Sequence, residues 1–146
     1  MKYFLRFVFI VIATFIGGLV NLGLVYFGYA IVPLPEGFDM NDENQFALAV
    51  SQFQPINYLF PFLAHFMGSL VASYIATRAL GTKTAWVLPS GLFLIGGMQM
   101  IQRVPSPMWF NAVDLGLAYF PAGYMGYLMA RNSRWKAFEA LDSQLT

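Results

Sequence analysis

Six polar or charged side chains lie within or at the ends of the long apolar stretches of this sequence, and they are the residues best suited to bind a ligand or exchange a proton. They comprise one histidine, one aspartate, one arginine and three amides: His65, Asp114, Arg103, Gln99, Gln102 and Asn21. A charge near the middle of a bilayer costs at least ~2.5–3.5 kcal/mol, so such groups face inward and find partners. We expect these six residues to line a site that binds a ligand or an ion.

Several pairings within this set are plausible, and each has a structural alternative. His65 is the only histidine of the chain, and histidine is the side chain that most readily changes charge near neutral pH. It could hydrogen-bond to Gln99 or to Asp114, and Arg103 could form an ion pair with Asp114. The alternatives are that His65 only joins two helices and that Arg103 only closes a loop. For Asn21, which lies among glycines, an interhelical hydrogen bond is the expected role.

The residue types exclude several classes of site. The chain has no cysteine, which removes disulfide exchange, thiolate catalysis and cysteine-ligated metals. With one histidine, and only Asp114 as an acid inside the apolar stretches, we expect no metal site, and no particular cofactor is indicated. Ser69 lies one helical turn from His65, which alone is too common an arrangement to predict a hydrolase. A net charge of +1 gives no reason to expect nucleic acid as a partner.

Four long apolar segments must position these residues. They cover about residues 4–32, 57–79, 85–102 and 112–130, and about 18 or more apolar residues suffice for a helix to cross a bilayer. The chain is 58% hydrophobic and 10% charged, whereas soluble domains carry about 25% charged residues. We therefore predict an all-α, polytopic membrane protein, with four transmembrane helices in an antiparallel bundle that forms one domain over residues 1–146.

The basic residues predict the orientation of this bundle. Seven of the eight lysines and arginines lie at the start of the first segment, on either side of the loop between the second and third, or after the fourth, and Arg103 is the exception. Basic residues favour the cytoplasmic side. We expect both termini in the cytoplasm, a cytoplasmic tail at 131–146 and a location in the inner (plasma) membrane.

The loop at 33–56 is then exterior and predicts one further helix. Asn41 or Asp42 can cap a short helix that runs to about Phe53, in which Phe46 and Val50 recur at helical spacing. Such an amphipathic helix lies either in the outer membrane interface or as a lid over the mouth of the bundle. Both arrangements produce the same spacing of apolar residues, so the sequence does not choose between them.

Each apolar segment has a face of small or polar residues that we expect to point inward. In the second segment this face holds Tyr58, Pro61, His65, Gly68, Ser69, Ala72 and Ala76. In the third it holds Gly91, Ile95, Met98 and Gln102, with Gln99 at its edge, and in the fourth Asp114, Ala118, Pro121 and Met125. With the helices oriented by the predicted topology, all six candidate residues lie in the outer half of the membrane.

The sequence thus supports three functions. The favoured one is a small multi-pass protein with a polar ligand- or ion-binding cavity, transport- or channel-like. The first alternative is a non-catalytic assembly or accessory subunit that docks through Gly17, Gly18, Gly68 or Gly91. The second is a membrane-embedded enzyme that acts on a lipophilic substrate. We expect membrane lipids, further copies of this chain or a larger membrane complex, and a small ligand or ion as partners.

Overall fold

Every regular element in the described part of the chain is a helix. The computed structural model describes residues 2–38 and 42–145. Its elements, in order, are α1 (Lys2–Ile31), α2 (Glu43–Ser51), the 3-10 helix η1 (Pro55–Tyr58), α3 (Leu59–Leu80), α4 (Val87–Arg103), α5 (Met108–Leu117) and α6 (Phe120–Leu145). Two segments, Phe4–Ile31 and Pro55–Leu80, are long and apolar enough to cross a membrane.

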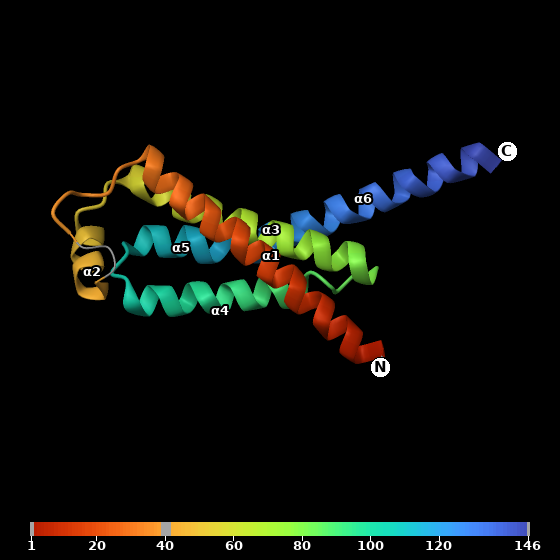
Figure 1. The fold of residues 1–146 in the computed structure, drawn as a ribbon, viewed down its shortest axis with the longest axis horizontal. Coiled ribbons are helices and arrows are strands. Elements are labelled where there is room, and N and C mark those ends of the chain that lie inside the picture. The colour runs from red at the N-terminus through yellow and green to blue at the C-terminus, as the bar shows by residue number, and fades with distance from the viewer. Residues whose placement is uncertain (1, 39–41, 146) are drawn as a thin grey trace.

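The long helices lie roughly along one axis, with α2 at one end (Figure 1). The α1 helix begins, and α6 ends, at the opposite end from α2. The helix α3 is central, because α1, α4 and α6 all pack against it. The last turns of α6 extend beyond the other helices.

Glycines set the distance between α1 and α3. A side-chain carbon on Gly17 would lie 2.7 Å from the Cβ of Ala72 and would press on the carbonyl oxygen of Gly68. Small residues are what allow two helix backbones to approach this closely. Gly18 and Gly91 have open space at the same position. Of the glycines predicted to dock a partner, Gly17 and Gly68 are therefore occupied by packing within the chain.

A serine contact joins α3 to α4 where α6 crosses them. The hydroxyl oxygens of Ser73 and Ser90 lie 3.2 Å apart, and both donate to the carbonyl oxygen of Trp86, at 3.3 and 2.9 Å. Gly123 of α6 packs on this pair, since a Cβ there would lie 2.9 Å from the Ser73 hydroxyl oxygen. Because all three helices are held by small side chains, this part of the bundle has little space inside.

The fourth apolar segment is not one helix, as predicted for residues 112–130, but two. The helix α5 ends at Leu117, a turn follows at Ala118 and Tyr119, and α6 begins at Phe120. Pro121 has no N–H to donate to the carbonyl of Leu117, and a proline ring clashes with the preceding turn. The break also changes which face is inward: Ala118 is buried as predicted, but Pro121 is exposed.

The helix α2 lies at one end of the bundle and packs against it, as predicted for a lid (Figure 1). The Asp42 carboxylate caps it by accepting from the N–H groups of Asn44 and Gln45 at 2.8 and 3.1 Å. The other predicted cap, Asn41, lies outside the described residues. From α2, Val50 joins Tyr58 and Phe110 in one buried cluster, with further aromatic side chains packed around it.

The contrast between two adjacent glycines of α1 gives a test of this packing. We expect Gly17→Ala to lower the free energy of unfolding by about 1–3 kcal/mol, because the added carbon overpacks the contact with α3. Gly18→Ala should leave stability unchanged or raise it by up to about 1 kcal/mol, since alanine is the better helix former. Circular dichroism during unfolding in detergent micelles measures both, and equal effects would contradict this account of the α1–α3 contact.

Candidate functional site

Three side chains from separate elements meet in one hydrogen-bonded group, the His65 cluster, which consists of His65, Asp114 and Tyr119. The Nδ1 atom of His65 lies 2.8 Å from Oδ1 and 3.0 Å from Oδ2 of Asp114. The Tyr119 hydroxyl donates to Asp114 Oδ2 at 2.7 Å and lies 3.0 Å from His65 Nδ1. The rings of His65 and Tyr119 are stacked, with centroids 5.6 Å apart.

The contacts of this cluster assign one tautomer to His65 when Asp114 is ionised. An ionised carboxylate can only accept, so the N–H at Nδ1 of His65 is then the donor of the hydrogen bond to Asp114. The Tyr119 hydroxyl supplies the second donor. The Asp114 side chain is 4% exposed and that of His65 is 21% exposed. The other imidazole nitrogen, Nε2, has no hydrogen-bond partner among the described residues, so it is the atom of the cluster that is available to a ligand.

The local sequence explains why these groups meet. Asp114 lies in the last turn of α5, and Tyr119 lies in the turn that follows, so the helix break folds one back toward the other. Gly97 of α4 provides room for the tyrosine, because a Cβ on Gly97 would lie 2.6 Å from the Tyr119 Cζ atom. Tyr119 is fully buried. A helix that continued straight through residues 118–119 would not bring the phenol to this position.

A chamber of about 240 Å³ lies between the His65 cluster and α2. Its polar lining comprises Asn21, His65, Ser106, Asn111 and Asp114, and tyrosines 29 and 58 also line it. Most of the remaining lining is apolar, including Val25, Phe46, Val50, Phe53, Met100 and Phe110. Ser106 and Asn111 hydrogen-bond to each other. An apolar cavity with a few converging polar groups is typical of a small-molecule site.

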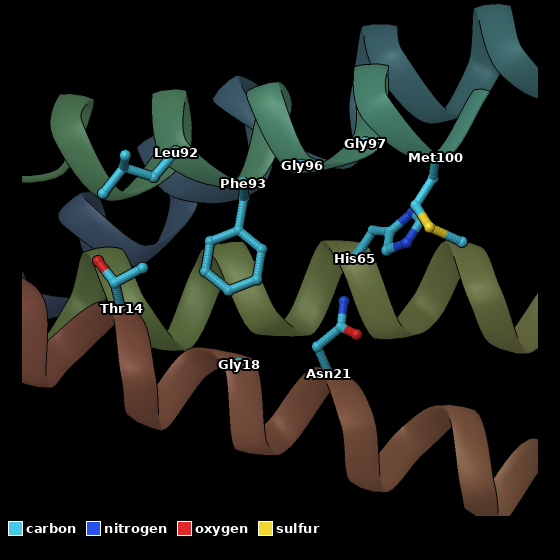
Figure 2. Close-up of a pocket in the computed structure, with 9 residues that line it drawn as sticks. All are labelled: Thr14, Gly18, Asn21, His65, Leu92, Phe93, Gly96, Gly97 and Met100. Atoms are coloured by element: carbon cyan, nitrogen blue, oxygen red, sulfur yellow. The ribbon is translucent and has the colours of Figure 1, made fainter. Parts of the chain in front are cut away.

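A second space, the groove, has a volume of about 360 Å³ and opens between α1 and α4, over α3. Figure 2 shows Phe93 reaching from α4 toward α1, and Asn21 pointing from α1 toward the helix that carries His65. Thr14, Gly18, Leu92 and Gly96 also line it. The groove and the chamber share four lining residues, which are Asn21, His65, Gly97 and Met100. Both spaces therefore meet at the exposed side of His65.

The structure brings together three of the six predicted site residues and leaves three apart. His65 and Asp114 are hydrogen-bonded to each other, and Asn21 lines both spaces beside His65. Gln99, Gln102 and Arg103 are exposed at the end of α4, and they line neither space. The described residues contain no Arg103–Asp114 ion pair and no His65–Gln99 hydrogen bond.

The inward face predicted for the third apolar segment was wrong. Ile95, Met98 and Gln102 are exposed, whereas Ser90, Phe93 and Gly97 face the other helices. The polar side chains at the end of α4 had suggested the opposite rotation. Long polar side chains at a helix end can reach a polar surrounding without facing the interior. The sequence reasoning also missed Tyr119, whose only signal was its place two residues before Pro121.

The cluster can orient a ligand, accept a hydrogen bond or exchange a proton at Nε2. A carboxylate that holds Nδ1–H fixes both the tautomer and the ring, as it does for histidines that act as ligands or bases. No group of three or more histidine, cysteine, aspartate or glutamate side chains that could hold a metal ion occurs among the described residues. Ser69 is fully buried and has no hydrogen bond to His65, so its spacing from the histidine gives no support to a hydrolytic site.

No protein-family model, no curated protein and no solved structure matches this chain. Because a fold by itself does not define a function, the function has to be argued from the site.

The single histidine makes the assigned tautomer measurable. We expect ¹⁵N NMR of histidine-labelled protein in nanodiscs at about pH 8 to find the proton on Nδ1 and none on Nε2. Asp114→Ala should abolish this preference, because the acceptor is lost, and Tyr119→Phe should shift the Nδ1 signal. Tyr124→Phe, a change of an exposed tyrosine, is the matched control and should leave both signals unchanged. A proton on Nε2 in the parent protein would contradict the assigned cluster.

Proposed function

We propose that this chain is a multi-pass membrane protein that binds a small molecule in a cavity in the outer half of its bundle. The observation that carries the proposal is the His65 cluster, in which Asp114 and Tyr119 fix the imidazole at the junction of the chamber and the groove. A buried carboxylate is costly unless it is paired. A ligand-binding role accounts for a histidine that keeps one nitrogen free beside it.

The exposed surface of the described residues supports the membrane part of the proposal. Large apolar side chains are exposed along much of α1, including Phe4, Phe7, Phe15, Leu19, Phe27 and Ile31. Apolar patches of this extent are unfavourable in water. In the proposed topology α1, α3, α4 and the α5–α6 pair are the four crossings. Both termini are cytoplasmic, in the inner membrane, and α2 lies outside.

The shape of the chamber supports transport only with a conformational change. The side chains of Phe46, Val50 and Phe53 line the chamber at its α2 end. Release of a ligand to the outside would therefore require α2 to move. The α2 helix is short and is held mainly by the cluster of Val50, Tyr58 and Phe110, which makes it the element best suited to such a motion.

A second candidate function, an accessory subunit, is favoured by one observation. Gln99 and Gln102 are exposed near the end of α4, together with Met98. Amides exposed on an otherwise apolar helix can hydrogen-bond to another protein in a membrane. This surface lies apart from the His65 cluster, so substitutions can separate the two functions.

Native mass spectrometry of detergent-purified protein tests the ligand-binding proposal. We expect the parent protein to retain a small molecule and His65→Ala to bind it about tenfold more weakly, because one hydrogen bond of about 1.4 kcal/mol is lost. Gln99→Ala is the matched control and should retain the molecule. An empty parent protein, or a molecule that His65→Ala binds as tightly as the parent does, would contradict the proposal. Loss of an oligomer in Gln99→Ala alone would favour the accessory function.

The absence of cysteine permits a direct test of the topology, because each introduced thiol is then unique. Glu36→Cys lies in the loop before α2, and Lys83→Cys lies between α3 and α4, and both positions are exposed. In intact spheroplasts a membrane-impermeant maleimide should label Glu36→Cys and should label Lys83→Cys only after permeabilisation. The reverse pattern would show that the proposed orientation is inverted, and equal labelling would argue against the crossings.

A further inference from the structure

We propose that the ligand of the His65 cluster is an uncharged, hydroxyl-bearing amphiphile. Its hydroxyl group lies at His65 Nε2, and its apolar chain lies in the groove between α1 and α4. This inference rests on the proposed function and adds the chemical class of the ligand and its route of entry. It is carried by the way in which the two spaces meet at one side chain, and by the unequal chemistry of their linings.

The two spaces meet at one junction, beside His65. The groove and the chamber are both bounded by His65 and Asn21 on one side and by Gly97 and Met100 of α4 on the other. Small-molecule pockets have volumes of about 300–1,000 Å³. The chamber alone, at about 240 Å³, falls below this range, whereas the two spaces taken together lie within it. A head group at His65 lies where the two spaces meet, with the groove available to the rest of the molecule.

The donors and acceptors at the junction select the head group. With its proton on Nδ1, neutral His65 offers a lone pair at Nε2, which accepts a hydrogen bond from a hydroxyl. The side chain of Asn21 can serve the same hydroxyl, because no described group hydrogen-bonds to it. Within the described part of the chain, neither space is lined by a lysine or an arginine. A carboxylate or phosphate head would therefore meet the negative charge of Asp114 without a permanent cation to balance it.

A cationic head is disfavoured for a different reason. Both oxygens of Asp114 already accept hydrogen bonds from His65 and Tyr119, and the carboxylate is almost fully covered. An ammonium group would have to lose its hydration without direct access to that charge, which is costly in an apolar cavity. A hydroxyl group loses far less hydration free energy than an ammonium group on transfer from water to an apolar cavity. The geometry thus favours a neutral donor over either ion.

The lining of the groove suits an apolar chain. Leu92, Phe93 and Met100 supply apolar surface, and the glycines Gly18 and Gly96 leave the space open, because a Cβ at either would meet nothing within 4 Å. The groove opens between two helices rather than at the α2 end. In the proposed topology this opening faces the hydrocarbon core, so an amphiphile dissolved in the bilayer can enter sideways and place its head at His65.

Filling the groove while sparing the head site tests this inference. We would titrate 1-dodecanol and 1-pentanol into nanodiscs that hold ¹⁵N-histidine-labelled protein, and follow the Nε2 signal of the single histidine. In the parent protein both alcohols should shift this signal, dodecanol at lower concentration. Gly18→Leu and Gly96→Leu should weaken dodecanol binding at least tenfold and leave pentanol binding unchanged. Gly23→Leu, which adds the same side chain at an open, exposed position of α1 outside the groove, is the matched control and should bind as the parent does.

Each contrary result has a distinct meaning. Unchanged dodecanol binding in both leucine variants would overturn the placement of the apolar chain in the groove and leave the proposed function intact. If neither alcohol shifts the Nε2 signal in the parent protein, the proposed hydroxyl head group at Nε2 is wrong. Equal or stronger shifts with dodecanoate or dodecylamine would overturn the choice of an uncharged head group. If either leucine variant changes the oligomeric state by native mass spectrometry while Gly23→Leu does not, the groove is covered by a second copy of the chain and the inference fails. An unchanged Nδ1 signal verifies that each variant retains the cluster.

Discussion

The buried carboxylate of Asp114 is the constraint on which the arrangement of this bundle depends. A carboxylate taken out of water is costly unless donors surround it, and here the two donors come from outside its own helix. His65 supplies one from α3, and Tyr119 supplies the other from the turn between α5 and α6. Satisfying one charge therefore fixes the register of α5 against α3 and requires a break in the fourth apolar segment. It also requires Gly97, because any larger residue on α4 would meet the Tyr119 ring.

The empty spaces follow from how the remaining helices pack around that group. Gly17 brings α1 close to α3, and the hydroxyls of Ser73 and Ser90 bring α4 close to α3 on another side. Both neighbours are thus held by the central helix rather than by each other, and α1 and α4 diverge where the groove opens. No other helix among the described residues fills this gap. The groove is a consequence of close packing elsewhere, and His65 is one of the residues that line it.

The sequence was sufficient for the helical class and for α2, because both depend on local pattern. It gave His65–Asp114 only as one of several pairings, beside His65–Gln99 and Arg103–Asp114, because the cost of a charge in an apolar segment predicts a partner without choosing it. The rotation of α4 could not be predicted in the same way. The polar residues indicated a face with Ile95, Met98 and Gln102, whereas the observed rotation follows a contact of Gly97 with Tyr119, which are far apart in the sequence. Pro121 indicated a disturbance in the fourth segment, but a proline in an apolar helix can produce either a kink or a break. The sequence reasoning therefore assigned no role to Tyr119, which only the observed break brings to Asp114.

The break gives the cluster a property that a continuous helix would lack. Because the Tyr119 hydroxyl bonds to Asp114 and lies against His65 Nδ1, the turn at residues 118–119 and the imidazole share one hydrogen-bonded group. Any ligand that changes the charge or orientation of the imidazole at Nε2 changes the partner that Tyr119 contacts. Under the proposed function, the group that holds the ligand is therefore also joined to the turn before α6, which leads to the opposite end of the bundle (Figure 1).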